Sequence, residues 1–486
     1  MKKGMEYIGT VERVDFPNKG LVRVVMPEGC EEGGGEKDIR VMVKGILKGQ
    51  KISFRLTKLH KGSKKAEGRL IEVLEPAPQE IKAPCSLSGS CGGCAYQSLP
   101  YDEQLVLKEE QIKRLMDAVI TGPYEFMPIR RSPQPERYRN KMEFSFGNQQ
   151  KDGPLELGLH KKGSFYDILT TDTCRIVHED YNLILREVLA LAKETGLAHF
   201  HKITHKGYFR HLVIRRGQKT GEILINLVTS QDTETRSADY TGQAEPKTFC
   251  EEEFFQTLCR RLQALPLAGK IVGILHSRNN SPADIVTSEE TTILYGTDHF
   301  YEELLGLRFK ITPFSFFQTN SLGAEVLYST AREFIGEAEG KVVFDLYSGT
   351  GTIAQMMAFV AKKVIGVEIV EEAVEAAREN AKENGLANCE FIAGDVLKVL
   401  DGIEERPDFI VLDPPRDGIH PRALEKIIAY GVEHLVYISC KPTSLQRDLV
   451  TLQEHGYCVR KVCPVDEFPM TAHVETVVLM SKEKEK

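Results

Sequence analysis

Residues 341–361, KVVFDLYSGTGTIAQMMAFVA, set the architecture of the second half of the chain. An apolar run of strand length leads to Asp345, a turn follows with glycine at 349 and 351, and a helical pattern begins at once. Such glycines let a ligand approach the backbone where a helix amino terminus points into the crevice of an α/β sheet. Because Ala354 stands where the pyrophosphate signature has its third glycine, the turn favours S-adenosylmethionine (SAM) over NAD.

The alternation of strand and helix continues beyond this stretch. KVIGVEIV ends near Glu368, CEFIAGDV leads to Asp395, and DFIVLDPPRDG carries Asp413 after its apolar run. Repeated strand–helix units predict a doubly wound parallel sheet, whose strand ends meet along one edge. The three acids are therefore expected in one crevice, with Glu368 accepting hydrogen bonds from ribose hydroxyls.

Two further strand ends carry candidate catalytic groups. The apolar run Leu435 to Ile438 leads into Ser-Cys-Lys-Pro, so Cys440 is either an accessible nucleophile or a small buried hydrophobe. VDEFPMTAHVETVVLM, residues 465–480, is expected to be a strand. Its Glu475 is either a base beside Cys440 or a surface residue on an edge strand.

Size and composition indicate a soluble chain of two to four domains. It has 486 residues, 41% of them hydrophobic, and a formal charge of −7, which gives no overall argument for nucleic acid. Residues 1–75 differ, with 16 Lys and Arg against 11 Asp and Glu. The amino terminus turns polar before a signal-peptide core forms, and no apolar run has membrane-spanning length, so we predict a cytoplasmic protein.

The first 305 residues divide into segments of different character. Short apolar runs over 5–75 predict a small antiparallel β-barrel. The barrel loops carry Lys58, Lys61, Lys64 and Lys65, which either follow phosphates or are simply solvated. Residues 100–120 predict an amphipathic helix, and 125–305 a mixed α+β region. Basic residues beside its strands either contact a polyanion or face solvent; they are Arg137, Arg139, Lys141, Arg210, Arg215 and Arg216.

A cysteine cluster lies between the barrel and the helix. Cys85, Cys91 and Cys94 share a glycine-rich loop, and Cys174 is the best candidate for a fourth ligand. The spacing fits an iron–sulfur centre and zinc equally well.

In this order, the motifs resemble those of the RNA uracil-5-methyltransferases, in particular the RumA-type ribosomal RNA enzymes with a TRAM domain and an iron–sulfur cluster. The markers are the front barrel, CSLSGSCGGC, YRNKMEFSFG, FSFFQTN, DLYSGTGT, VLDPPRDG, YISCKP and FPMTAHVE. The resemblance implies an α/β fold with a Rossmann-like class I methyltransferase domain. The implied divisions are a TRAM-like, OB-like RNA-binding β-barrel over 1–78, a cluster loop over 79–98, a helix packing on the catalytic domain over 99–124, a central α+β RNA-binding domain over 125–305, and the SAM-dependent catalytic domain over 306–486.

The resemblance also assigns residues. It implies that Cys440 is the nucleophile and Glu475 the base. The implied SAM site consists of Gln318, Tyr347, Glu368, Asp395 and Asp413, and the implied ligands of a 4Fe-4S cluster are Cys85, Cys91, Cys94 and Cys174. Lys441 is a departure, because relatives more often have asparagine there, and a cation beside the thiol is expected to lower the pKa of Cys440.

The implied function is SAM-dependent methylation of carbon 5 of a uridine in 23S ribosomal RNA by a monomer. A transfer-RNA enzyme of the same chemistry and a non-catalytic RNA-binding assembly factor are the alternatives. A cytosine enzyme is disfavoured because such families place the cysteine after Pro or Thr, whereas Ser439 precedes Cys440. An amino-group methylase is disfavoured because Arg416, not an aromatic residue, follows the DPP motif.

Overall fold

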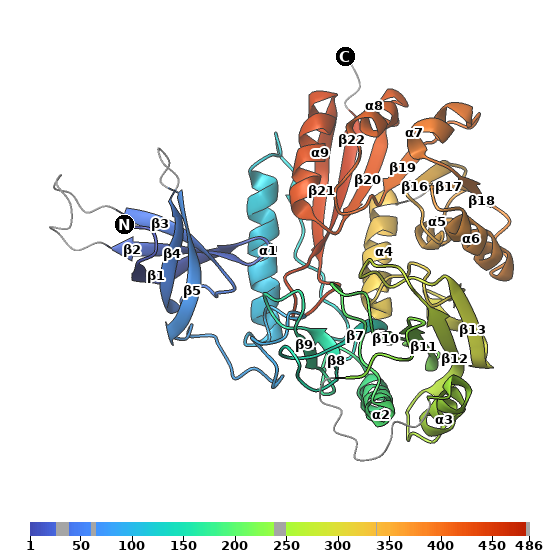
Figure 1. Cartoon of the computed structure of the whole chain (residues 1–486). Coiled ribbons are helices and arrows are strands. Elements are labelled where there is room, and N and C mark those ends of the chain that lie inside the picture. Colours follow the sequence, from blue (N-terminus) through green and yellow to red (C-terminus); the bar gives the residue numbers. More distant parts are fainter. Residues whose placement is uncertain (26–37, 60–64, 238–248, 337, 483–486) are drawn as a thin grey trace.

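The computed structural model describes residues 1–25, 38–59, 65–237, 249–336 and 338–482. Figure 1 shows an amino-terminal barrel, a long helix beside it, a central α+β region and a carboxyl-terminal α/β sheet. Within the described ranges, no helix is long and apolar enough to cross a membrane.

The amino-terminal strands close into a barrel in the order β1-β2-β3-β5-β4. Their bounds are β1 (Glu6–Asp15), β2 (Lys19–Val25), β3 (Asp38–Lys44), β4 (Lys51–Leu59) and β5 (Lys65–Glu75). Alternate residues such as Val22, Val41 and Phe54 fill the interior. The predicted barrel is confirmed, but β3 and β5 run parallel, so the expectation of an entirely antiparallel barrel is wrong. Lys58 is exposed, whereas Lys61 and Lys64 lie outside the described residues.

Helix α1 (Tyr101–Asp117) stands between the barrel and the carboxyl-terminal sheet, and it confirms the predicted helix (Figure 1). Leu107 joins the barrel core, while Ile112 joins the core of the carboxyl-terminal sheet. On the same helix, the fully buried Lys108 ammonium lies 2.5 Å from the carboxylate of Asp466. Because either charge alone would be costly to bury, this pair ties the helix to the segment that precedes the last strand.

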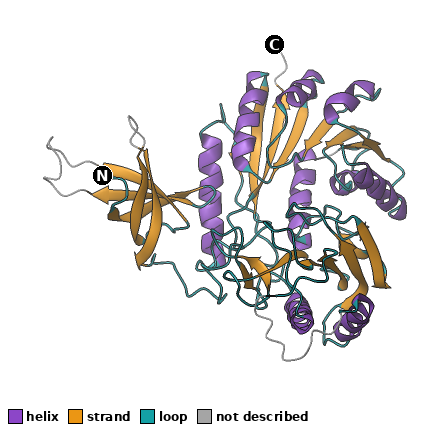
Figure 2. Ribbon diagram, viewed as in Figure 1, coloured by secondary structure: helices purple, strands orange, loops and turns teal. Residues whose placement is uncertain are grey.

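The central region is built on a seven-stranded sheet in the order β13-β12-β11-β10-β7-β8-β9. Helices α2 (Glu179–Thr195) and α3 (Glu251–Gln263) pack together on it (Figure 2). The strands are β7 (Lys141–Gly147), β8 (Glu156–His160), β9 (Ile168–Thr170), β10 (Phe209–Arg216), β11 (Glu222–Thr229), β12 (Lys270–Arg278) and β13 (Glu290–Gly296). A two-stranded hairpin, β14 (Phe300–Leu304) and β15 (Leu307–Ile311), leads on to the carboxyl-terminal region.

The carboxyl-terminal sheet has eight strands in the order β18-β17-β16-β19-β20-β22-β21-β6. The strands are β6 (Glu125–Phe126), β16 (Val342–Leu346), β17 (Lys363–Glu368), β18 (Cys389–Ala393), β19 (Phe409–Leu412), β20 (His434–Ser439), β21 (Tyr457–Val465) and β22 (Glu475–Lys482). The helices around it are α4 (Ser321–Ile335), α5 (Thr352–Met357), α6 (Glu371–Glu383), α7 (Val396–Val399), α8 (Pro421–Ala429) and α9 (Pro442–Glu454), with a 3-10 turn over Leu400–Gly402.

The predicted doubly wound sheet is confirmed over its first five strands, which pair in parallel. The chain leaves β16 to form β17 on one side and later returns to β19 on the other, so the strand order reverses at β16 and opens a crevice at its carboxyl end. Two antiparallel pairings follow, because β22 inserts between β20 and β21, and β6 then pairs in parallel with β21 at the edge of the sheet.

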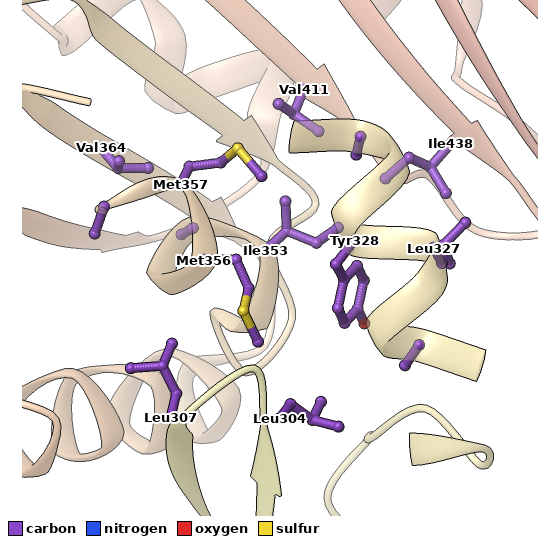
Figure 3. Close-up of a cluster of buried hydrophobic side chains, with 14 of the residues drawn as sticks. Leu304, Leu307, Leu327, Tyr328, Ile353, Met356, Met357, Val364, Val411 and Ile438 are labelled. Atoms are coloured by element: carbon purple, nitrogen blue, oxygen red, sulfur yellow. The ribbon is translucent and has the colours of Figure 1, made fainter. Parts of the chain in front are cut away.

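Helices cover both faces of this sheet. On one face, α4, α5 and α6 pack with the β14–β15 hairpin, and Figure 3 shows Leu304, Leu327, Ile353 and Met356 meeting in this cluster. On the other face, α7, α8 and α9 pack together with α1. The strand ends that carry the candidate catalytic groups are therefore held by two continuous cores.

Candidate active site

Cys440 follows the last residue of the central strand β20. Pro442 at the first position of α9 stops further strand pairing, so the half-buried Cys440 lies between a strand end and a helix start. Burial, and then the charges of Glu475 and Asp413, raise the pKa of the Cys440 thiol to about 12, while Arg416 acts in the opposite direction. Neutralising those acids would therefore favour the thiolate.

Lys441 does not have the effect expected from the sequence. Its ammonium lies 3.5 Å from the carboxylate of exposed Asp417, and the cation that most lowers the pKa of Cys440 is Arg416.

Glu475 is the first residue of β22 and is only 3% exposed. Strands β20 and β22 are antiparallel, with Ser439 opposite Thr476, and one further step in that register sets Cys440 opposite Glu475. Opposed residues of an antiparallel pair have α-carbons about 4.5–5.5 Å apart. Burial, and then Asp413, raise the pKa of Glu475 to about 8. The alternative of a surface glutamate on an edge strand is wrong, because β22 is an interior strand.

The predicted strand over 465–480 begins only at Glu475, and the preceding residues form a loop that follows β21. This loop holds Glu467, which the sequence did not single out. Its carboxyl group is fully buried, and neither oxygen has a hydrogen-bond partner among the described residues. Burial and the charge of Glu475 raise its pKa well above the usual range.

Two buried aspartates, Asp413 and Asp345, add to this group of acids. Burial raises the pKa of Asp413, after β19, to about 7, and burial together with Asp413 raises that of Asp345, in β16, to about 8. Acids that share a buried pocket favour a bound cation, because it offsets the cost of their ionisation. The pocket therefore suits a positively charged ligand such as a sulfonium.

The glycine turn follows the carboxyl end of β16, where the strand order of the sheet reverses. The Gly349 N–H donates to one carboxylate oxygen of Glu368 at 2.9 Å, and the N–H of Val370 donates to the other at 3.0 Å. Glu368 is thus fixed at the end of β17, facing the turn. Gly351 has φ of 74°, and a β-carbon there would lie 2.6 Å from the ring of Phe391 and 2.8 Å from Ala377.

The other predicted SAM residues lie around the same edge. Asp395 caps α7 by accepting from the Leu397 N–H at 2.9 Å. Burial, and then the charge of Asp395, raise the pKa of Tyr347 to about 12. Gln318 comes from the loop before α4, and its side chain hydrogen-bonds to Tyr328. The neighbouring Phe316 carbonyl accepts from Thr350 of the glycine turn at 3.4 Å, so this loop reaches over the crevice.

We expect Gly351→Ala to lower the free energy of unfolding by roughly 2–4 kcal/mol, because alanine must adopt a left-handed φ and collides with Phe391. Affinity for SAM should fall at least tenfold. Thermal denaturation and calorimetric titration measure both effects. Gly402→Ala is the matched control, because nothing lies within 4 Å of that position. Equal stability and affinity in the two variants would contradict this account of the turn.

The cysteine loop lies against the central sheet and the loop of Glu467. The Gly92 N–H donates to the carbonyl of His160 at 3.0 Å, and the Ala95 and Tyr96 N–H groups donate to the carbonyl of Met470. The charges of Cys85, Cys91 and Cys174 all act on Cys94, whose pKa burial raises to about 12. The predicted fourth cysteine is thus near the other three, although the described side chains contain no group of three or more His, Cys, Asp or Glu arranged tightly enough for one metal ion.

Three arginines that the sequence offered as RNA contacts have structural roles instead. Arg210 and Arg215 are 3% and 1% exposed and donate to backbone carbonyls, those of Asn279 and Pro313 among them. Arg216 pairs with the buried Asp180 at 3.0 Å. The expectation that these three contact a polyanion is wrong.

This architecture is that of a class I methyltransferase, with a ligand crevice at the strand-order reversal and a cysteine–glutamate pair beside it. Residues 284–483 match the family model described as tRNA (Uracil-5-)-methyltransferase. A protein of Clostridium tetani named an uncharacterized RNA methyltransferase is 46% identical over 98% of each chain. One of Caldanaerobacter subterraneus with the same description is 45% identical over 99% of this chain and 100% of its own. The chain belongs to the RNA (uracil-5-)-methyltransferase family.

A solved structure supports the fold over nearly the full length. The Pyrococcus abyssi tRNA (uracil-54, C5)-methyltransferase, in complex with S-adenosyl-L-homocysteine, superposes with a TM-score of 0.70 at 24% identity. The match covers 97% of this chain and 100% of that one. The predicted α/β fold, with an amino-terminal β-barrel and a Rossmann-like methyltransferase domain, is thereby confirmed.

Proposed function

We propose that the protein methylates carbon 5 of a uridine in 23S ribosomal RNA through a transient covalent bond to Cys440. The observation that carries the proposal is the pairing of Ser439 with Thr476 in the β20–β22 register, because Cys440 and the buried Glu475 are the next residues of the two segments. A nucleophile and a base on opposed strand ends can act on adjacent atoms of one ring. To reach both groups, the uridine has to leave its stack.

The residues present account for each step of the reaction. The Cys440 thiolate forms a bond to carbon 6, and the displaced electron pair makes carbon 5 nucleophilic. When bound, SAM supplies an electrophilic methyl group on a sulfonium. After carbon 5 has gained the methyl, Glu475 takes the carbon-5 proton, and the electrons of that C–H bond expel the thiolate from carbon 6. Nothing is oxidised or reduced.

The SAM site we propose consists of Gln318, Tyr347, Glu368, Asp395 and Asp413. Glu368 is already oriented by the glycine turn, and a carboxylate at that strand end suits ribose hydroxyls. The charge of Asp413, which follows β19, acts on Asp345, Cys440 and Glu475 alike. A sulfonium beside it would favour ionisation of all three neighbours.

The rate should depend on pH through Glu475. Its pKa is raised to about 8, so the base is largely protonated at pH 6 and ionises as the pH rises. We expect kcat/KM to increase with pH and the slope of its logarithm to decrease near pH 8, where Glu475 becomes fully ionised; the Cys440 thiol, whose pKa is about 12, sustains the remaining rise, and Glu475→Gln should remove only the inflection near pH 8. Initial rates of tritium transfer from SAM across pH 6–9 measure it. A flat wild-type profile would argue against Glu475 as the base.

We also propose that Cys85, Cys91, Cys94 and Cys174 hold a 4Fe-4S cluster. The donor set fits, because it offers four thiols and N–H groups that donate to them: Gly93 to Cys91 at 3.4 Å, and Ile176 and Val177 to Cys174. Four cysteines could also hold zinc, and the family resemblance is what favours the cluster. Bound there, a cluster would fasten the cysteine loop to the central sheet.

We expect the protein purified without oxygen to contain four iron and four sulfide per chain, and Cys94→Ser to lose most of both. Cys259→Ser, which alters a half-buried thiol on α3, is the control and should keep them. Metal and sulfide analysis with the visible spectrum provides the measurement. A colourless wild-type protein with one zinc per chain would overturn the assignment.

Ribosomal RNA is the substrate we favour, on the strength of the barrel and the cysteine loop together. Transfer RNA is the second candidate, because the matching family model carries that name. Incubation with tritiated SAM and unmodified 23S ribosomal RNA or transfer RNA, followed by nucleoside analysis, separates them. Label in 5-methyluridine of 23S RNA is expected, and label only in transfer RNA would select the alternative. A monomeric, cytoplasmic enzyme is part of the same proposal.

A further inference from the structure

Two neighbouring turns of the central region expose apolar side chains that no core explains. The first turn, residues 161–166, carries Phe165 and Tyr166, which are 84% and 60% exposed. The second, residues 201–206, carries Ile203, which is 66% exposed. The turns touch, because the Lys202 ammonium donates to the Phe165 carbonyl at 2.9 Å. Exposed aromatic residues gathered in this way mark an interaction surface.

The two turns are held in place by their own hydrogen bonds. The Ser164 hydroxyl accepts from the N–H groups of Tyr166 and Asp167 at 3.2 and 3.1 Å. Lys202 is fixed by Asp284 at 2.6 Å, and the His201 ring accepts from the N–H groups of Ile203 and Thr204, each at 3.3 Å. The rings are thus presented to solvent by an ordered backbone, which reduces the entropy that a partner must overcome on binding.

The charge around the rings is positive. Lys161, Lys162 and Lys206 are exposed, and none of them pairs with a carboxylate in the described part of the chain. The ammonium of Lys162 lies beside Gly45 of the barrel, so the surface continues toward that domain. Aromatic rings flanked by unpaired lysines suit a polyanion whose bases can stack, which favours RNA over a protein partner.

We propose that the turns 161–166 and 201–206 form a binding platform for a single-stranded segment of the RNA substrate. Bases stack on Phe165 and Tyr166, and phosphates lie along Lys161, Lys162 and Lys206. A duplex keeps its base faces covered, so the platform selects unpaired nucleotides. The inference rests on the proposed function, because it specifies the form of RNA that the enzyme recognises.

Direct contacts link this platform to the catalytic pair. The Lys162 N–H donates to the Ser90 carbonyl at 2.7 Å, so the first turn is fastened to the cysteine loop. That loop binds the carbonyl of Met470, five residues before Glu475. An RNA strand bound on the turns is therefore held by elements that contact the catalytic segment, and the cysteine loop joins the two.

The test compares Phe165→Ala/Tyr166→Ala in the full chain with a matched control, Tyr295→Ala/Phe359→Ala. The control removes one tyrosine and one phenylalanine that are 39% and 55% exposed, with Tyr295 on β13 at the opposite edge of the central sheet from β9. Fluorescence anisotropy with a labelled single-stranded RNA 12-mer and a hairpin duplex of the same composition measures binding. We expect single-strand affinity to fall at least tenfold in the platform variant and less than twofold in the control.

Duplex affinity should change less than threefold in both variants. Lys161→Ala/Lys162→Ala should lower the slope of log affinity against log salt by about one to two. If the platform variant kept the wild-type melting temperature and its affinity for single-stranded RNA were unchanged, the proposal would be overturned. The surface would then be assigned to a protein partner. Because binding is measured without SAM or turnover, failure of the methylation chemistry would appear separately, as the absence of 5-methyluridine with an intact platform.

Discussion

Cys440→Ala should abolish methyl transfer, with a fall in kcat of at least about 10⁴-fold, while SAM binding is retained. In the proposed mechanism the thiol bonds to carbon 6, and without that bond carbon 5 stays a poor nucleophile. The proposed SAM site is formed by other strand ends, so the affinity for SAM should change less than threefold. Tritium transfer to RNA and calorimetric titration with SAM measure the two quantities.

Cys250→Ala is the matched control for this prediction, since it removes an exposed thiol at the start of α3 in the central region. It should retain wild-type activity. Activity in Cys440→Ala above about a tenth of the wild-type rate would reject the covalent route. If Cys440→Ala instead lacked methyl transfer but supported ribosome assembly as well as the wild type, the non-catalytic alternative would be favoured.

Glu475→Gln should allow the bond between the Cys440 sulfur and carbon 6 to form but prevent its cleavage. Without the carboxylate, the carbon-5 proton stays in place and the thiolate cannot be expelled. We therefore expect turnover to fall about 10²–10⁴-fold while a covalent protein–RNA adduct accumulates. Denaturing gel electrophoresis with labelled RNA and SAM detects the adduct as a species of reduced mobility.

The control for this variant is Glu454→Gln at the exposed end of α9, which removes one carboxylate far from the β20–β22 strand ends. It should turn over normally and form no stable adduct. If Glu475→Gln neither slowed turnover nor trapped RNA, the base would have to be another group. Glu467 would be the first to test, because its buried carboxyl interacts with Glu475.

The crevice could be predicted from the sequence because its acids follow apolar runs in a strand–helix alternation. That pattern predicts that residues such as Glu368 and Asp413 lie at the carboxyl ends of parallel strands, whatever fold the rest of the chain has. Cys440 was placed at a strand end by the same argument. The sequence left Glu475 either beside Cys440 or on an edge strand, and only the family resemblance chose between the two, because β22 inserts antiparallel after β21 and no local pattern gives that register.

The sequence could not predict which charged side chains are buried. Arg215 looks like any basic residue beside a strand, yet its guanidinium donates to the carbonyl of Pro313, ninety-eight residues further on. Glu467 follows Asp466 directly, as two adjacent acids of an exposed loop would, and only the contact of its loop with α1 shows that it is enclosed. Both depend on partners far along the chain, which periodicity does not reveal.

Trapping with RNA that contains 5-fluorouracil tests the covalent mechanism most directly. Fluorine in place of the carbon-5 hydrogen cannot leave as a proton, so the reaction stops after methyl transfer with the ring still bonded to sulfur. With SAM present, we predict a stable adduct whose digestion and mass spectrometry place the modification on Cys440. No adduct, or an adduct on another cysteine such as Cys389, would contradict the mechanism.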